Sequence, residues 1–213
     1  LVELVLPDGE VIDIESAEGL PAPIPHYSVG GDGLVQYADT GQSQAADCIH
    51  TLKIGTGRFF RITLADSTAV WLNSESEISY PGRFGESERR VSLSGEAWFE
   101  VAPDASKPFR IDFDGGSVTV LGTKFNLSAY PNDRHIYTTL AEGSVQVSSG
   151  GGQTLLTPGH QCIIERSTGE VSVAEADASD YRAWVDGRFV FRAKPLSMIM
   201  RQLERWYGVQ AQY

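Results

Sequence analysis

The sequence has few cysteines, and they lie far apart. Its 213 residues include only Cys48 and Cys162, with no Cys-x-x-Cys pair and no cysteine adjacent to a histidine. Zinc sites and dithiol redox sites need such groupings, so we expect neither. An oxidising compartment such as a periplasm permits a disulfide between the two, but nothing local pairs them. We therefore favour two separate thiols that pack as small hydrophobic side chains.

Positive charge is scarce as well. Seventeen Lys and Arg residues stand against 28 Asp and Glu residues, which gives a net charge of -11. A field of this sign repels nucleic acid phosphates and acidic membrane surfaces, so we expect no nucleic-acid binding. The sequence also lacks a signal peptide and any apolar run long enough to cross a bilayer. Because Leu1 already begins the alternating segment Leu1–Leu6, we expect the chain to start inside a folded region of a longer protein.

Catalytic motifs are missing. There is no Gly-x-Ser-x-Gly elbow, and Gly150–Gly152 lacks the lysine and the following helix of a phosphate-binding loop. Glu96 and Glu100 share one face of a predicted strand and could form a glycosidase carboxylate pair, but solvated strand faces commonly carry glutamate. The histidines lack the spacing of metal ligands and stand at His26, His50, His135 and His160. We therefore expect no enzymatic activity, no cofactor and no metal.

What the sequence does contain is a pattern of many short strands. Twenty-two glycines and ten prolines are scattered among short apolar runs, which is typical of many turns between many strands. The clearest strand is Val91–Val101, where apolar and polar residues alternate and only Trp98 breaks the polar face. This alternation predicts a half-buried antiparallel strand with one dry and one wet face. Gly95 inside it predicts a bulge or a close backbone approach.

A change of alternation marks one bend in the chain. Val118 and Val120 have one parity, whereas Phe125 and Leu127 have the other, so the buried face persists only if Gly122–Thr123 forms a bulge or bend. Short strand units of this kind fit an antiparallel β-roll, a solenoid-like layer or a sandwich. We predict a mainly β domain over residues 1–180.

The pattern changes after residue 180. Phe189–Phe191 is strand-like, and Leu196–Tyr207 has apolar residues at helical spacing between Pro195 and Gly208. Strand alternation resumes over Val209–Tyr213. Residues 181–213 therefore predict a truncated α/β segment of strand, helix and strand, too short to bury its own core.

Several motifs together resemble the FecR family of anti-sigma regulators. The resemblance extends in order from about Leu64 to Tyr213, and residues 1–60 match only loosely. Asp66-Ser67 stands where the family usually has Asp-Gly, so the turn there can be of another type. The segments that carry the resemblance are Val70–Asn73, Tyr80–Pro81, Arg90–Val101, Lys107–Phe109, Val120–Asn126, Ala129–Tyr130, Thr139–Val145, Leu156–Gly159 and Leu203–Tyr207.

The resemblance implies a function. It implies the periplasmic domain of an inner-membrane protein, with a sigma-binding cytoplasmic segment and a single membrane helix upstream that this sequence does not show. It also implies that the N-terminal signalling domain of a TonB-dependent outer-membrane transducer, sensing an iron chelate or a glycan, signals through this region to an extracytoplasmic-function sigma factor. By the same resemblance, residues 181–213 begin a short module of the secretin/TonB type.

Two expectations concern binding surfaces. We expect the apolar stripe of the helix to pack on the flanking strands, so that Arg201 and Arg205 point away and form, with the strand edge at Tyr213, a surface for an acidic partner domain. The alternative function is a carbohydrate-binding β module, in which exposed aromatic rings would stack on a sugar. Its candidate rings are Trp71, Tyr80, Trp98 and Tyr130.

Overall fold

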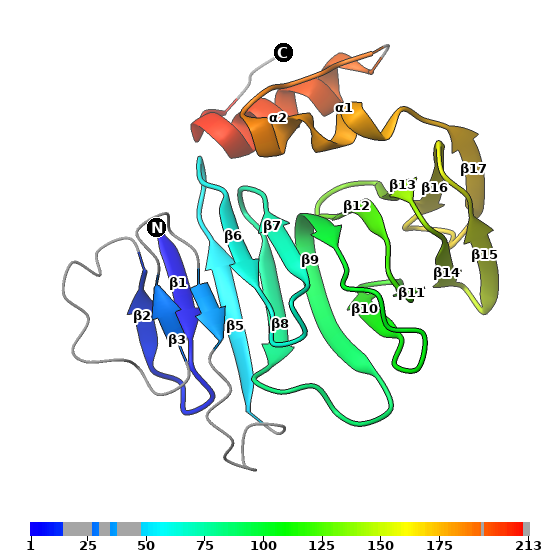
Figure 1. Ribbon diagram of the computed structural model, residues 1–213. Helices are drawn as coiled ribbons and strands as arrows, with labels where there is room; N and C mark the ends of the chain where they lie inside the picture. The colour runs from blue at the N-terminus through cyan, green and yellow to red at the C-terminus, as the bar shows by residue number, and fades with distance from the viewer. Residues whose placement is uncertain (15–26, 30–34, 38–47, 193, 211–213) are drawn as a thin grey trace.

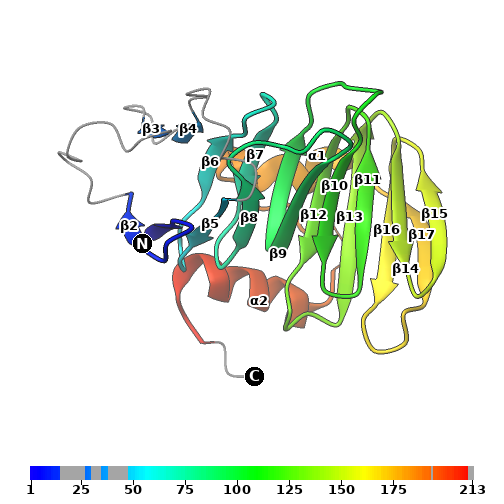
Figure 2. The same cartoon turned by 90° about the horizontal axis from the view of Figure 1, so that it is seen from below.

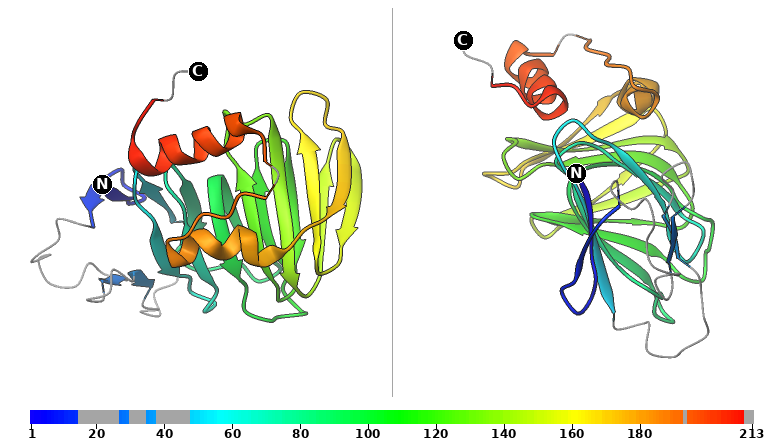
Figure 3. Two further views of the ribbon diagram at one scale, coloured as in Figure 1. Left: turned by 90° about the horizontal axis from the view of Figure 1, so that it is seen from above. Right: turned by 90° about the vertical axis from the view of Figure 1, so that its left-hand side faces the viewer.

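The structure is a computed structural model that describes residues 1–14, 27–29, 35–37, 48–192 and 194–210. Its described part is mainly β: seventeen strands are hydrogen-bonded into one sheet that does not close. The sheet folds over into two layers that face each other (Figures 1 and 3). The predicted mainly β fold is confirmed.

The first layer contains nine strands, all paired antiparallel to their neighbours except β9 and β10, which run parallel. Their spatial order starts at β2 and ends at β15. In that order the strands are β2 (Val11–Asp13), β1 (Val2–Val5), β5 (Ile49–Ile54), β8 (Glu77–Pro81), the first half of β9 (Arg89–Glu100), β10 (Phe109–Phe113), β11 (Gly116–Val120), β14 (Val145–Ser149) and β15 (Gly152–Leu156).

The second layer is built in the same way, with one parallel pair between β4 and β6. In spatial order its strands are β3 (Tyr27–Val29), β4 (Val35–Tyr37), β6 (Phe60–Thr63), β7 (Ala69–Leu72), the second half of β9, β12 (Lys124–Ala129), β13 (His135–Glu142), β16 (His160–Glu165) and β17 (Val171–Glu175).

Successive hairpins alternate between the layers. The hairpin β10–β11 lies in the first layer, β12–β13 in the second, β14–β15 in the first and β16–β17 in the second. Figure 2 shows the result: the strands of the two layers interleave across the molecule, and the colours run from blue at β2 to yellow at β15 and β17. The chain therefore winds as a two-layered β-roll. Its layers enclose one apolar core, in which the rings of Phe99 and Phe125 stack with centroids 5.2 Å apart.

The long strand β9 joins the two layers. Residues up to Ser94 pair with β8 and β10 in the first layer, and residues from Gly95 on pair with β7 and β12 in the second. The strand crosses at Gly95, where φ is +103° and an added Cβ would lie 2.6 Å from the Cα of Ser76. The close backbone approach predicted at Gly95 is confirmed.

The bend predicted at Gly122–Thr123 is also confirmed. Here the chain leaves β11 in the first layer and enters β12 in the second, so Val120 and Phe125 both reach the core although their parity differs. Pro103 lies against the bend, and its Cα would be 2.8 Å from a Cβ at Gly122.

The turn between β6 and β7 keeps a left-handed residue without glycine. Ser67 has φ +70°. The carboxylate of Asp66 holds the turn by accepting hydrogen bonds from the backbone N–H and the hydroxyl of Thr68, at 3.0 and 2.7 Å. Serine therefore occupies a conformation that favours glycine.

A helical segment covers the outer face of the second layer (Figure 3). It consists of α1 (Ala178–Arg182), the 3-10 turn η2 (Ala183–Asp186) and α2 (Leu196–Tyr207). The predicted helix and its end are confirmed, because the N–H of Gly208 bonds to the carbonyl of Glu204 at 2.8 Å with φ +64°. No helix in the described part of the chain has the length and apolar character needed to span a membrane.

The strands predicted on both sides of α2 differ from the structure. Phe189–Phe191 is irregular and pairs with no strand of the described sheet; its two rings stack on each other, and Phe189 also packs edge-on against Trp206 at 4.9 Å. Side-chain packing on the helix replaces strand pairing there. Of the second predicted strand, residues 209 and 210 are irregular and residues 211–213 lie outside the described residues.

Replacing Gly95 by alanine tests the crossing of β9. We expect a loss of about 3 kcal/mol in the free energy of unfolding, because the methyl group meets Ser76 and the positive φ adds strain. Gly151→Ala is the matched control: its φ is +80° but nothing lies within 4 Å of an added Cβ, so strain alone should cost about 1 kcal/mol. Chemical denaturation measures both. Equal losses would refute the close approach.

Candidate functional site

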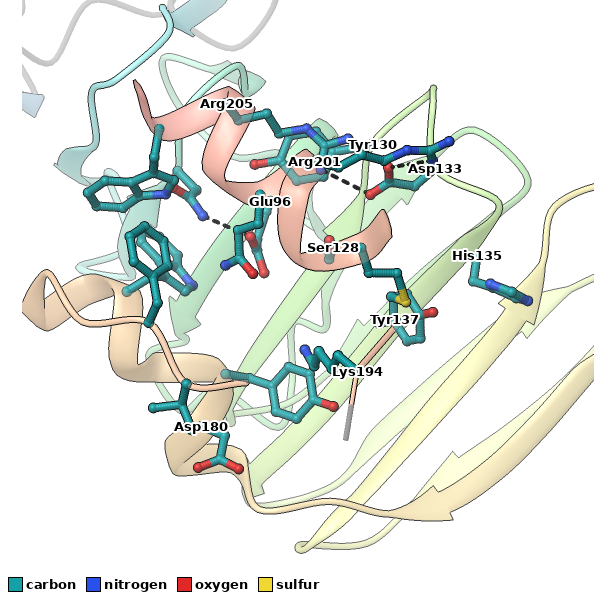
Figure 4. Close-up of a pocket in the computed structure, with 18 of the residues that line it drawn as sticks. Glu96, Ser128, Tyr130, Asp133, His135, Tyr137, Asp180, Lys194, Arg201 and Arg205 are labelled. Atoms are coloured by element: carbon teal, nitrogen blue, oxygen red, sulfur yellow. Dashed lines mark hydrogen bonds and ion pairs between the residues drawn. The ribbon is translucent and has the colours of Figure 1, made fainter. Parts of the chain in front are cut away.

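The candidate site is a cavity of about 510 Å³ between the second layer and the helical segment. Strands β9, β12 and β13 supply its floor, and α1, η2 and α2 supply its cover (Figure 4). Both charged and aromatic side chains line it. The cavity therefore lies where the family-like β region meets the C-terminal segment.

Glu96 is the most buried acid of the cavity, with 8% of the residue exposed. Its carboxylate accepts hydrogen bonds from the Nδ2 atoms of Asn73 at 2.8 Å and Asn126 at 2.9 Å. Burial raises the pKa of Glu96 above its usual value, and the two amide bonds oppose the shift in part. The Oδ1 atom of Asn126 in turn accepts the indole N–H of Trp184 at 3.2 Å, which fixes η2 over the sheet.

This burial corrects one expectation about β9. The predicted wet face is exposed in the first layer, at Arg90, Ser92 and Ser94. In the second layer Glu96 and Trp98 on the same face are buried, because the helical segment covers them. Glu96 and Glu100 are therefore not an open carboxylate pair: Glu96 is bound by two amides, and Glu100 accepts the indole N–H of Trp98 at 3.2 Å.

The second correction concerns Arg201 and Arg205. Both point towards the β-roll and bind Asp133 in the loop between β12 and β13. Arg205 is 14% exposed, forms a two-pronged ion pair with Asp133 at 2.7 and 3.1 Å, and lies 3.6 Å above the ring of Tyr130. Arg201 reaches the same carboxylate at 3.4 Å and the carbonyl of Asn132 at 3.1 Å.

The expected free basic face of α2 is therefore wrong, because both arginines bind Asp133 of the β-roll. The helix is further attached by the N–H of Gly57, which bonds to the carbonyl of Arg205 at 2.9 Å, and by stacking of Phe59 on Trp206. A role of Arg201, Arg205 and Tyr213 in partner binding stays a prediction, and Tyr213 lies outside the described residues.

The apolar stripe of α2 faces away from the sheet. The helix lines the cavity with its polar side and Trp206, namely Ser197, Met198, Arg201, Gln202, Arg205 and Trp206. The opposite side carries Leu196, Ile199, Met200, Leu203 and Tyr207, of which Leu196 is 64% and Tyr207 66% exposed. The expected orientation is wrong for the sheet, which meets the polar side of the helix, but one expected contact is present, because Phe189 packs on Tyr207 with ring centroids 6.4 Å apart.

The aromatic residues named for a sugar platform do not form one. Tyr80, Trp98 and Tyr130 are buried. Trp71 is half-buried, and the guanidinium of Arg61 lies 4.8 Å above its ring. Their role is packing, which removes the feature that supports a carbohydrate-binding module.

The two cysteines lie apart in the structure, and the candidate metal ligands among the described residues are scattered. Cys48 and Cys162 are not joined by a disulfide, and burial raises the pKa of Cys162 to about 11. In the part of the chain that the structure describes, no group of three or more His, Cys, Asp and Glu side chains could hold a metal.

Asp133→Asn tests the attachment of α2. Removing the charge leaves Arg205 without its carboxylate in a half-buried site, so we expect a loss of about 2 kcal/mol in stability. Glu165→Gln is the control, since its partner Arg134 is exposed and exposed pairs contribute little to stability. Hydrogen exchange of the α2 amides should accelerate in Asp133→Asn only. Unchanged α2 exchange in this variant would disprove the attachment.

Glu96→Gln tests the buried carboxyl. A raised pKa means that the folded state holds the proton more tightly than the unfolded state, so stability falls as pH rises above 4.5, the ordinary value. In the variant, the free energy of unfolding should not fall over this pH range. At low pH the variant should be less stable than the wild type by about 1–3 kcal/mol, because the new amide faces the amide of Asn73 or Asn126. Unfolding measured across pH, with Glu100→Gln as control, checks this. Parallel curves for Glu96→Gln and the wild type would contradict it.

Comparisons with known proteins relate both the β-roll and the C-terminal segment to one family. Residues 50–146 match the family model described as FecR protein, and residues 188–213 match the one described as FecR, C-terminal. Two crystal structures of a "putative anti-sigma factor" from Parabacteroides distasonis are similar, both with a TM-score of 0.72. One is 33% identical over 74% of each chain, the other 32% identical over 75% of each. No curated protein matches. The chain belongs to the FecR family of anti-sigma regulators.

Proposed function

We propose that this chain is the periplasmic signal-receiving region of a transmembrane anti-sigma regulator. In this role it takes a signal from the N-terminal domain of a TonB-dependent outer-membrane transducer and passes it to an extracytoplasmic-function sigma factor. The family is regulatory, which supports sigma regulation and not catalysis as the function. Contact with the sigma factor belongs to a cytoplasmic segment outside this chain.

One observation carries the proposal. The segment matched by the FecR C-terminal model, residues 188–213, is held to the β-roll by specific side chains and not by a linker alone. Arg205, Trp206 and the backbone of Gly57 make these contacts. A partner that binds α2 therefore acts on the β-roll through defined bonds, as a signal-receiving region requires.

We place the partner on the outer side of α2. Apolar residues there follow the spacing i, i+3, i+4, i+7 and i+11 from Leu196 to Tyr207, the pattern by which a helix enters a hydrophobic groove. Val209, just after the helix, is also 51% exposed. Exposed apolar residues gathered on one face mark interaction surfaces more often than scattered ones. Residues 1–180 then form the supporting β region and residues 181–213 the docking segment.

Binding of the chain to the transducer's N-terminal domain tests the proposal. We expect Leu196→Asp with Tyr207→Asp to weaken binding at least about tenfold, because two apolar anchors become charged. Leu155→Asp is the control: this leucine of β15 is as exposed, at 69%, but lies on the β-roll. Calorimetry or surface plasmon resonance measures each constant.

A second variant separates the two surfaces. Arg201→Glu with Arg205→Glu places acids opposite Asp133 and should undock α2. Binding that falls in this variant and stays unchanged in the Leu196–Tyr207 variant would move the site to the arginine face. No binding by the wild-type chain would reject the transducer as partner.

A further inference from the structure

The cavity beneath α2 has the dimensions of a small-molecule site. Its volume of about 510 Å³ falls within the range of about 300–1,000 Å³ that ligand pockets occupy. Part of its wall is aromatic, with Tyr137 from β13, Tyr181 from α1, and Phe189 and Trp206 from the C-terminal segment. A small organic molecule therefore fits both the space and the walls.

The charge of the lining favours an anion. Six cationic side chains line the cavity against three carboxylates, those of Glu96, Asp133 and Asp180, in a chain whose net charge is -11. The cations are Arg134, Arg188, Arg192, Lys194, Arg201 and Arg205. The arginines of this set pair with carboxylates, namely Arg134 with Glu165, Arg188 with Asp186, Arg192 with Asp180, and both Arg201 and Arg205 with Asp133. Among the described lining residues, Lys194 is the cation left for an anion.

The three carboxylates are already engaged. Two asparagine amides hold Glu96, and Arg201 and Arg205 hold Asp133. The Nε atom of Arg192 lies 2.8 Å from the carboxylate of Asp180. The acceptors of the lining therefore have partners from the protein itself, and a cationic ligand would have to displace them.

Two donors of the same lining have no such partner among the described residues. The ammonium of Lys194 lies 4.5 Å from the centre of the Tyr181 ring. The charges of Glu96 and Asp180 act on it, although no carboxylate of the described residues lies within ion-pair distance. Figure 4 shows Lys194 between Glu96 and Asp180. The indole Nε1–H of Trp206 is buried without a hydrogen-bond acceptor in the described structure. A buried N–H without an acceptor is costly, so Trp206 favours a ligand that supplies one. The half-buried ammonium of Lys194 adds a preference for a negative charge.

We propose that the cavity binds a small organic carboxylate. Its carboxylate pairs with the ammonium of Lys194, a second acceptor atom receives the N–H of Trp206, and its apolar body packs on the rings of Tyr181 and Phe189. This site is separate from the partner surface on the outer side of α2. A chain that binds no carboxylate therefore leaves the proposed function intact.

Titration of the purified chain with four probes tests the site. Benzoate carries one carboxylate, terephthalate carries two across a ring, benzylamine has the shape of benzoate with the opposite charge, and inorganic phosphate has no apolar body. We expect saturable binding of benzoate or terephthalate at about 1 mM or tighter, which is ordinary for so few contacts. Benzylamine and phosphate should bind at least about tenfold more weakly.

Matched variants assign the contacts. Lys194→Met keeps the length of the side chain and should weaken carboxylate binding at least about tenfold, whereas Lys53→Met, an exposed lysine of β5, should leave it unchanged. Trp206→Phe keeps a ring without the N–H and identifies the indole signal of Trp206 in the ¹H–¹⁵N spectrum. That signal should move when the wild-type chain is titrated. Thermal melting confirms that each variant is folded.

Three results would overturn the inference. One is the absence of saturable carboxylate binding by the wild-type chain. Another is equal or tighter binding of benzylamine or phosphate. The third is carboxylate binding that persists at full strength in folded Lys194→Met, which would place any carboxylate site elsewhere on the chain.

Discussion

The structure depends on a carboxylate that is buried between strands and helices. Glu96 binds Asn73 beyond the end of β7 and Asn126 on β12, and Asn126 continues the chain of hydrogen bonds to Trp184. A buried carboxylate is tolerated only when such bonds replace water. Because the bonds come from four separate segments, they hold the middle of the second layer and its helical cover in one arrangement.

The orientation of α2 follows from the same polar surface. An amphipathic helix normally turns its apolar side to the protein, but the outer face of the second layer offers Asp133, Tyr130 and polar strand residues. Arg205 meets both Asp133 and the Tyr130 ring, and only Trp206 adds a large apolar contact with Phe59. Polar docking therefore leaves the apolar stripe on the outer side, where Leu196 and Tyr207 are exposed and Ile199, Met200 and Leu203 are half-buried.

The sequence predicted the structural features that depend on residues close together in the chain. The alternation of β9, the parity change at Gly122 and the helix ending at Gly208 are properties of neighbouring residues, and each is present in the structure. Burial of Glu96 and Trp98 is not local, because it depends on which strand face the distant segment 178–207 covers. Periodicity likewise shows that α2 has two faces but not which one meets the sheet. Asn73 and Asn126 stood inside the family-like motifs, yet only their meeting at Glu96 shows their role.

The cavity lies on one side of α2 and the proposed partner surface on the other, so binding on one side can affect binding on the other. A carboxylate held by Lys194 and Trp206 with its body on Tyr181 would contact both α1 and the segment that carries α2, and would thereby favour the docked position of α2. A partner that pulls α2 outward must break the bonds of Arg205 to Asp133 and open the cavity. Thermodynamic reciprocity then requires that the ligand lower the affinity for such a partner by the same factor by which the partner lowers the affinity for the ligand. A partner that binds α2 in place would show no such antagonism, and the sign of the coupling distinguishes the two modes of signalling.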